Sequence, residues 1–297
     1  MINKVILFVF TLSVLLVSCK SNDNIKSNCA ENEGAEILMY AGEEREYLIY
    51  VPDSYDGSGK VPLMLNFHGF GGLASDYMEY ADMRPQADAN GFILVYPQGT
   101  CLDGFPHWNA ALNGLDNKSD VDDLGFVEAL ISELSANYSI DLERVYACGY
   151  SNGAFFSYAL ACYQSDLIAA IGSVSGTMLD TSISCAPNHP TAMINLHGTE
   201  DDVIPYAGGS DYISIPSVLE YWIDFNNTNT TPITNIETDK EISIEHTQYL
   251  EGDNGVVVEH YKMVDGKHVW FEVEYQGANT SQLIWDFVSQ YDINGLR

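Results

Sequence analysis

Basic side chains are scarce in this sequence. Its 297 residues include 12 Lys and Arg against 42 Asp and Glu, which gives a formal net charge of −30. Proteins that bind nucleic acid gain affinity from basic side chains that displace counterions from phosphates, so the composition argues against such a partner. It also disfavours anionic membranes and polyanionic substrates. We interpret the acidic excess as a solubilising surface.

A long apolar run is also missing. The N-terminal stretch Val5–Val17 is interrupted by Thr11 and Ser13, and it is too short to span a bilayer comfortably, which takes about 20 residues. With its short basic start it has the pattern of a signal peptide. It runs into Ser18-Cys19, which resembles the lipobox of bacterial lipoproteins, where the cysteine is lipidated. An ordinary cleaved signal with a chance cysteine is the alternative.

These features predict three segments. Residues 1–19 are a lipoprotein-type signal peptide, residues 20–35 a polar tether, and residues 36–297 a single folded domain. We expect the protein to be exported and anchored by the lipid on Cys19 to the cell envelope or surface, or otherwise secreted. That anchor is the only membrane contact that the sequence predicts.

Cysteines are few, and no CxxC or Cys/His cluster has the spacing of a zinc site. With Cys19 set aside, an odd number remains, so at least one thiol is expected to be free. Cys148 lies in an apolar strand-like run and is the candidate for it. Cys162 and Cys185 flank a short segment and could form a disulfide.

Apolar residues make up 46% of the chain and charged residues 18%, enough apolar content for a sizeable core. Short apolar runs alternate with segments of helical periodicity. The expected strands are 45–51, 61–67, 92–96, 144–149, 167–175, 191–196 and 256–264, and the expected helices are 75–89, 121–138, 153–162, 217–225 and 281–291. This alternation predicts an α/β fold with a mainly parallel sheet covered by helices on both faces.

The strongest chemical signal is Gly149-Tyr150-Ser151-Asn152-Gly153, between an expected strand and an expected helix. G-x-S-x-G in that context is typical of a nucleophile elbow, a turn so sharp that only small residues fit on either side of the serine. Ser151 is therefore the predicted nucleophile. As a bare pattern the motif is weak, and a tight turn without chemistry is the alternative.

A nucleophilic serine needs a base, and the base needs an orienting acid. In this fold the order along the chain is Ser, then Asp or Glu, then His. The loop after the strand at 191–196 offers Glu200, Asp201 and Asp202, and spacing alone does not separate them. Of the later histidines, His268 follows a turn after the last long strand, so it is the predicted base.

An oxyanion hole needs two backbone N–H donors. One is expected from Asn152, directly after the nucleophile. The other is expected from His68-Gly69-Phe70-Gly71-Gly72, which follows the strand at 61–67 and is of the HGGG type. The N–H of Phe70 is the candidate donor. A flexible Gly-rich loop is the alternative.

Together these motifs resemble the exported esterases that join polyhydroxybutyrate depolymerase-like enzymes with feruloyl and acetylxylan esterases (carbohydrate esterase family 1). The resemblance covers about residues 43–291. Besides the elbow and the His68 loop, it rests on four segments: Trp108-Asn109, Val121–Phe126, His197-Gly198-Thr199-Glu200-Asp201 with Val203–Tyr206, and His268-Val269-Trp270. The resemblance implies an α/β-hydrolase fold, Asp201 as the acid and His268 as the base.

The resemblance also implies a serine esterase that needs no metal or cofactor. It places five residues near the substrate: His68, Trp108, Tyr150, Tyr206 and Trp270. For Trp108 and Trp270, packing in the core is the alternative. The expected substrates are small or polysaccharide-linked feruloyl or acetyl esters. Hydroxyalkanoate esters are the alternative, and a catalytically silent glycan-binding lipoprotein is an alternative of another class. The oligomeric state is not predicted.

Two departures from the family pattern concern the substrate. The family usually has several glycines before the base and a proline after the tryptophan, where this chain has Asp265-Gly266-Lys267 and Phe271. Cysteine is common in the family where this chain has Phe70. The resemblance therefore predicts the class of reaction more firmly than the acyl group.

Overall fold

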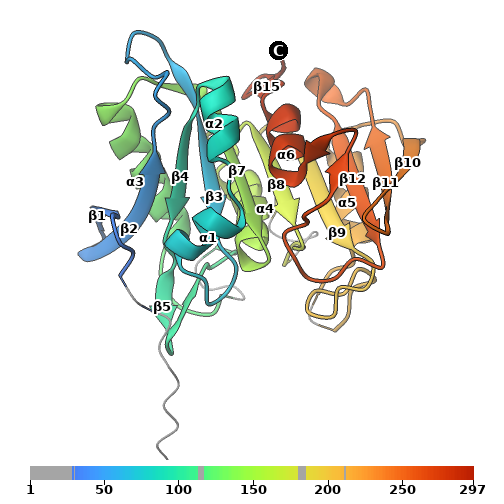
Figure 1. Cartoon of the computed structure of the whole chain (residues 1–297), viewed down its shortest axis with the longest axis horizontal. Helices are drawn as coiled ribbons and strands as arrows, with labels where there is room; N and C mark the ends of the chain where they lie inside the picture. Colours follow the sequence, from blue (N-terminus) through green and yellow to red (C-terminus); the bar gives the residue numbers. More distant parts are fainter. Residues whose placement is uncertain (1–28, 30, 113–116, 180–184, 211) are drawn as a thin grey trace, which may run out of the picture.

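The computed structural model describes residues 29, 31–112, 117–179, 185–210 and 212–297. They form one mixed ten-stranded sheet with helices on both faces (Figure 1). The predicted signal peptide, with Cys19, lies outside the described residues. None of the helices in the described part of the chain has the length and apolar character needed to cross a membrane.

Six parallel strands form the centre of the sheet, in the order β4-β3-β7-β8-β9-β12. Antiparallel strands extend it on both sides, β2 and β1 beyond β4, and β11 and β10 beyond β12. The bounds are β1 Glu36–Tyr40, β2 Glu43–Tyr50, β3 Val61–Phe67, β4 Ile93–Pro97, β7 Ile140–Tyr150, β8 Ala170–Val174, β9 Ala192–Gly198, β10 Ile233–Asp239, β11 Ile242–Tyr249 and β12 Val258–Val264.

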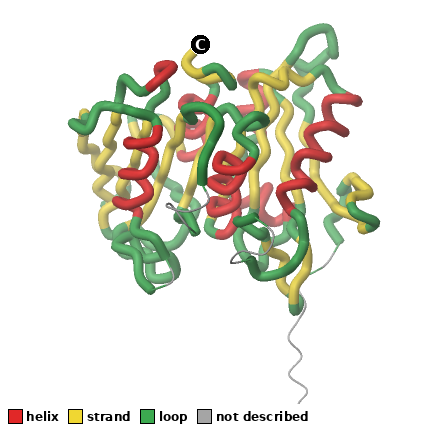
Figure 2. The backbone as a smooth tube through the Cα atoms, turned by 180° about the vertical axis from the view of Figure 1, so that it is seen from behind, coloured by secondary structure: helices red, strands yellow, loops and turns green. Residues whose placement is uncertain are grey.

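Each face of the sheet has its own hydrophobic core. On one face the side chains of β3, β7 and β9 pack against α3 (Asp123–Asn137), α4 (Asn152–Tyr163) and α5 (Ile215–Phe225). On the other they pack against α1 (Ala74–Tyr80), α2 (Arg84–Asn90) and α6 (Thr280–Val288). Figure 1 is viewed from the α1 and α6 side, and Figure 2 shows the opposite layer. The central strands are buried on both faces, which explains their continuous apolar sequences.

The smaller elements lie in the connections between these layers. They are the hairpins β5–β6 (Thr100–Leu102 and Phe105–His107), β13–β14 (Glu274–Tyr275 and Ala278–Asn279) and β15–β16 (Tyr291–Asp292 and Gly295–Leu296), and the short 3-10 helix Asp253–Gly255.

The predicted α/β fold with a mainly parallel sheet is confirmed, with one error in the helices. The helix expected at 75–89 is two helices, α1 and α2, separated by Ala81–Met83. Pro85 lies in the first turn of α2. Proline has no N–H for an intrahelical bond and disfavours helical geometry in the residue before it, so a new helix begins there instead of one helix continuing.

The end of the predicted tether belongs to the folded domain, which corrects the expected boundary at residue 36. Cys29 forms a disulfide with Cys101, with 5.9 Å between their Cα atoms. Asn32 is buried, and its side-chain N–H groups donate to Glu46 and Gln98 at 2.7 and 2.8 Å. Composition suggested a tether here because these residues are polar. Their partners lie far along the chain and could not be read from the sequence.

Cys162 and Cys185 form a second disulfide, and Cys148 is a free, buried thiol. Burial raises the pKa of Cys148 well above its usual value, so the thiol stays protonated and unreactive at neutral pH. The second disulfide joins the end of α4 to the segment that leads to β9. It therefore cross-links two elements beside the nucleophile.

Removing the second disulfide should destabilise the fold. Its cysteines are 23 residues apart, and closing a loop of that size restricts the unfolded chain by an amount worth about 3 kcal/mol. We expect the double variant Cys162→Ala/Cys185→Ala to have a lower urea midpoint than the wild type. Cys148→Ala is the control for loss of a thiol without loss of a cross-link. An unchanged midpoint in the double variant would contradict this role.

Candidate active site

The candidate site lies where the parallel strands end, at the lower edge in Figure 1. Carboxyl ends of parallel strands share one edge of a sheet, so the loops that follow them converge in space. Four strands contribute. The loop after β3 holds the glycine-rich segment, the turn after β7 holds Ser151, and the loops after β9 and β12 hold Asp201 and His268.

Ser151 occupies the sharp turn between β7 and α4. Its backbone has φ 52° and ψ −120°, a strained conformation for a residue with a side chain and one expected of a nucleophile elbow. The two flanking glycines are required by space. A Cβ on Gly149 would collide with the backbone of Gly153, and one on Gly153 would collide with the carbonyl of Phe67. The two glycines thus allow β7 and α4 to pack closely at the turn that holds Ser151.

Ser151, His268 and Asp201 form a continuous hydrogen-bonded chain. His268 Nε2 lies 2.9 Å from Ser151 Oγ, and His268 Nδ1 lies 2.8 Å from Asp201 Oδ2. Because the Asp201 carboxylate can only accept, Nδ1 carries the ring proton and Nε2 is left to accept from the serine hydroxyl. This is the tautomer that a general base needs.

Asp201 is held by three N–H groups. Its Oδ1 accepts from the backbone of Val203 at 2.9 Å and of Ile204 at 2.7 Å. Its Oδ2 accepts from His268 and lies 3.3 Å from His197 Nε2. Burial would raise the pKa of Asp201, but the bonds from His268 and the Ile204 N–H outweigh it, and the pKa lies below its usual value. The carboxylate is therefore ionised and fixed in orientation.

The loop that carries His268 is tied to three other elements. The hydroxyl of Tyr150 donates to the carbonyl of His268 at 2.9 Å, and that of Ser175 donates to the carbonyl of Val269 at 2.8 Å. The N–H of Trp270 donates to the hydroxyl of Tyr80 at 2.7 Å. These bonds fix the imidazole from the ends of β7 and β8 and from α1, so the base is preorganised.

The glycine-rich loop lies against the nucleophile. A Cβ on Gly69 would sit 3.3 Å from Ser151 Cβ and 3.0 Å from the ring of Tyr150, so the absence of a side chain favours this close approach. Within the described part of the chain, the N–H of Phe70 has no acceptor. Asn152 is the first residue of α4, and its N–H precedes the first intrahelical bond. Both predicted oxyanion donors are thus available for a ligand.

His68 holds this loop in place through hydrogen bonds of its buried ring. It is fully buried, its Nδ1 donates to the carbonyl of Gly69 at 2.7 Å, and its Nε2 accepts from the N–H of Gly99 at 2.9 Å. Burial lowers the pKa of His68 to about 4. The ring is therefore neutral at physiological pH, and its two hydrogen bonds shape the loop.

Two buried histidines should make the fold sensitive to mild acid. Burial lowers the pKa of His68 to about 4 and that of His260 to about 3, against 6.5 in the unfolded chain. Stability from these neutral rings is present above pH 6.5 and is lost as the pH falls towards 4, because the unfolded state binds protons first. We expect a lower urea midpoint at pH 5 than at pH 7.

The variant His68→Gln tests this explanation, since glutamine can still accept a hydrogen bond and does not titrate. Its midpoint should change less between pH 7 and pH 5 than that of the wild type. An equal change in both proteins would mean that His68 does not contribute to the acid sensitivity.

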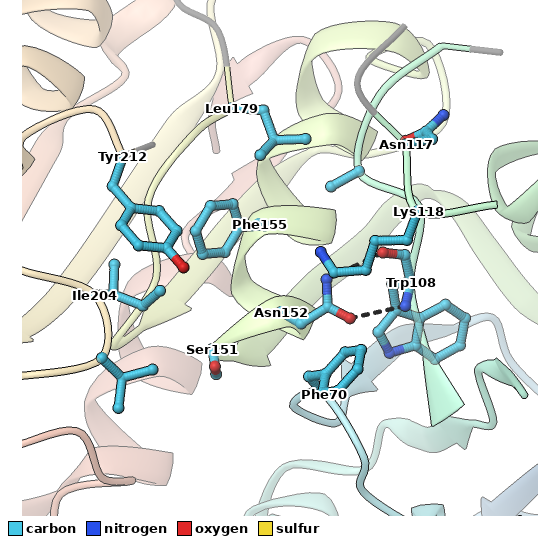
Figure 3. A pocket seen from close by; sticks show the side chains of 12 residues that line it. Phe70, Trp108, Asn117, Lys118, Ser151, Asn152, Phe155, Leu179, Ile204 and Tyr212 are labelled. Atoms are coloured by element: carbon cyan, nitrogen blue, oxygen red, sulfur yellow. Dashed lines mark hydrogen bonds between the residues drawn. The ribbon is translucent and has the colours of Figure 1, made fainter. Parts of the chain in front are cut away.

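An apolar pocket of about 300 Å³ opens beside Ser151. In Figure 3 its walls face one another across the serine, and Asn117 and Lys118 bring polar groups to one side. The apolar part of the lining is Phe70, Trp108, Ala110, Phe155, Leu179, Val203, Ile204 and Tyr212. Trp108 is fixed by Asn152, because its N–H donates to Asn152 Oδ1 at 2.8 Å and its carbonyl accepts from Asn152 Nδ2 at 3.0 Å (Figure 3).

The five predicted substrate-binding residues are distributed differently from the expectation. Only Trp108 lines the pocket beside Ser151. His68 and Tyr150 border a second, neighbouring pocket. Trp270 is buried in the core on the α1 and α6 face. The hydroxyl of Tyr206 is hydrogen-bonded to His260 Nε2 at 2.9 Å, and Tyr206 lines neither pocket. Trp270 therefore packs in the core on the opposite face of the sheet, whereas Tyr206 packs against the core that contains Trp108.

Several pocket residues escaped the sequence analysis. Phe155 lies four residues after Ser151 in α4, so helical spacing could have placed it over the serine. Leu179 is in the connection after β8, and Ile204 and Tyr212 are in the connection between β9 and α5. No local pattern marks such residues, because only the fold brings the loops together.

Solved structures share this architecture. An acetyl xylan esterase from Aspergillus awamori matches with a TM-score of 0.58 and 15% identity, over 79% of this chain and 94% of that one. A thermostable esterase matches with a TM-score of 0.56 and 16% identity, over 87% of this chain and 62% of that one. The chain has the α/β-hydrolase fold. At these identities the likeness concerns the fold alone.

Sequence comparisons place this α/β-hydrolase near esterases. The phospholipase/carboxylesterase family model matches residues 105–228. A bifunctional acetylxylan esterase/xylanase from Neocallimastix patriciarum is 26% identical over 86% of this chain and 34% of its own length. A probable feruloyl esterase C from Aspergillus niger is 25% identical over 68% of this chain and 72% of its own length. These relatives confirm the resemblance drawn from the motifs.

Several curated relatives are longer proteins. The α/β-hydrolase spans 34%, 50% and 31% of the length of the bifunctional enzyme, of a putative esterase NocK from Nocardia uniformis and of a feruloyl esterase B from Piromyces equi. What those whole proteins do is therefore not transferred to this chain by similarity alone.

Proposed function

We propose that this α/β-hydrolase is a serine carboxylic-ester hydrolase that acts on feruloyl or acetyl esters of plant polysaccharide. The observation that carries the proposal is the bonded series Ser151–His268–Asp201, whose serine lines an apolar pocket. The esterases among its relatives support the same class of reaction.

The geometry supports acyl transfer in two halves. Ser151 Oγ attacks the ester carbonyl while His268 Nε2 takes its proton, and the imidazolium then gives that proton to the departing alcohol oxygen. Asp201 holds the ring and stabilises its positive form. Water, deprotonated by His268, attacks the acyl-enzyme, and Ser151 recovers its proton as the acid leaves. The N–H groups of Phe70 and Asn152 stabilise both tetrahedral oxyanions.

The pocket beside Ser151 suits a phenolic acyl group. Its apolar lining offers flat contact to an aromatic ring through Phe70, Trp108 and Phe155. Lys118 supplies a cation to the same pocket, and its Nζ lies 5.9 Å from the centroid of the Phe70 ring. An ammonium there can donate to the phenolic oxygens of ferulate. Apolar walls with one polar group are the usual form of a site for a small aromatic ligand.

A hydrolysis panel on the purified protein tests the proposal. It contains p-nitrophenyl acetate, methyl ferulate and a short 3-hydroxybutyrate ester, each measured beside Ser151→Ala as the blank. We expect methyl ferulate to give the highest kcat/KM. A preference for the hydroxybutyrate ester would favour the depolymerase-like alternative. No hydrolysis of any ester by folded protein would overturn the esterase proposal and favour a glycan-binding lipoprotein.

We infer that the protein works outside the cytoplasm. The two disulfides, Cys29–Cys101 and Cys162–Cys185, support an oxidising compartment, in line with the signal-like residues 1–19. A lipid on Cys19 would then hold the domain at the cell envelope. Mass spectrometry of the mature protein tests this, since an acylated N-terminal cysteine would support the anchor and a free N-terminus elsewhere would contradict it.

A further inference from the structure

A second pocket borders the site, and the proposed mechanism has not used it. It has a volume of about 470 Å³ and is formed by the glycine-rich loop, α1 and the end of β7. Its lining is His68, Gly69, Phe70, Gly71, Gly72, Leu73, Asp76, Tyr77, Tyr80 and Tyr150. Phe70 lines this pocket as well as the one beside Ser151, so its half-exposed ring stands between the two.

The two pockets differ in chemistry. The one beside Ser151 is mostly apolar, whereas the second offers an exposed carboxylate, Asp76, and an exposed aromatic ring, Tyr80. These two residues are four positions apart on α1, so they lie on the same side of the helix. A carboxylate that accepts from hydroxyl groups, beside a ring that packs against C–H bonds, is suited to a sugar.

The second pocket lies on the side of the site from which the alcohol must leave. The departing oxygen takes its proton from His268, so the alcohol has to be close to that ring. Tyr150 forms a wall of this pocket, its ring centroid is 5.0 Å from that of His268, and its hydroxyl bonds the His268 carbonyl. Tyr80 packs on Tyr150 with 5.7 Å between ring centroids. Tyr150 thus connects this pocket to the base.

We propose that this second pocket binds the sugar that carries the ester, while the acyl group lies in the pocket beside Ser151. The inference rests on the proposed esterase function and adds the site of the leaving group. Asp76 and Tyr80 become specificity-determining residues that contact the sugar, and Phe70 separates the sugar from the acyl group.

Two esters with the same acyl group test the assignment. Methyl ferulate and a feruloylated arabinose disaccharide differ only in their alcohol, so their ratio of kcat/KM isolates contacts to the sugar. We expect the wild type to prefer the sugar ester. Asp76→Ala should lower that preference about tenfold through a higher KM, because one charge-assisted hydrogen bond is lost. Its activity on methyl ferulate should stay within about twofold of the wild type.

Tyr80→Ala should lower the same ratio, even if losing the bond to Trp270 reduces activity on both esters. Glu79→Ala is the matched control, because Glu79 is exposed on the same helix, pairs with Arg84 and does not line the pocket. It should leave the ratio unchanged.

The outcomes separate this inference from the proposed function. A wild type that hydrolyses both esters equally well, or an Asp76→Ala variant that slows both by the same factor, would overturn the sugar pocket while the esterase proposal stands. Failure of the wild type to hydrolyse either ester would overturn the proposed function itself.

Discussion

Ser151→Ala is expected to lower kcat on methyl ferulate by about 10⁶-fold, the size of effect seen when a triad serine is removed from a serine protease. The variant removes the only atom that would form the acyl-enzyme. Any remaining turnover must come from water bound near the two N–H groups of Phe70 and Asn152, which are unchanged by the substitution. Steady-state kinetics with enzyme at high concentration can measure this residual rate.

The stability of Ser151→Ala serves as its control. The serine side chain makes no helix-capping bond, and its backbone is strained at φ 52°. Alanine adopts such a conformation no more easily than serine, so thermal unfolding should differ little from that of the wild type. Full activity in the variant would show that another residue is the nucleophile.

Asp201→Asn is expected to lower kcat by about 10⁴-fold, with little change in KM. An amide at this position can present its NH₂ to His268 Nδ1, which favours the tautomer with the proton on Nε2. That nitrogen could then no longer accept from Ser151 Oγ, 2.9 Å away. The loss belongs to the chemical step, because Asp201 faces His268 and the Val203–Ile204 backbone and does not line the acyl pocket.

Its two acidic neighbours supply matched controls. Glu200 pairs with Lys267 at the surface, and exposed pairs of this kind contribute at most about 1 kcal/mol. Asp202 is exposed. Glu200→Gln and Asp202→Asn should therefore keep kcat within about threefold of the wild type. If either lowers kcat as much as Asp201→Asn, the acid is assigned to the wrong residue of this loop.

Local signals in the sequence predicted much of this protein. The central strands are mostly apolar because helices cover both faces of the sheet, and that pattern is visible in β3 and β4 without coordinates. The elbow could be predicted because Gly149 and Gly153 leave no space for a Cβ. The order serine, acid, histidine follows from the order of the strands, since each residue follows a different parallel strand.

The choice among neighbouring acids needed more than spacing. Glu200, Asp201 and Asp202 are consecutive, and only resemblance pointed to the middle one. In the structure the loop turns so that Asp201 faces inward to His268, while its neighbours face solvent. The backbone N–H groups of Val203 and Ile204 fix that direction by binding Oδ1. A turn of this kind depends on contacts that a linear motif does not contain.

The sequence by itself predicted the six central strands and, apart from the break between α1 and α2, the helices, and it pointed to the nucleophile and its base, because each of these depends on residues that are close along the chain. Tertiary structure alone decided which aromatic residues line the pocket beside Ser151. Trp108 faces the acyl pocket, Trp270 is buried in the opposite core and Tyr206 binds His260. It also decided that Cys29 pairs with Cys101 and that two pockets meet at Phe70. The physical reason is the same in each case: the partners are far apart in sequence, and only the packing of the sheet brings them together.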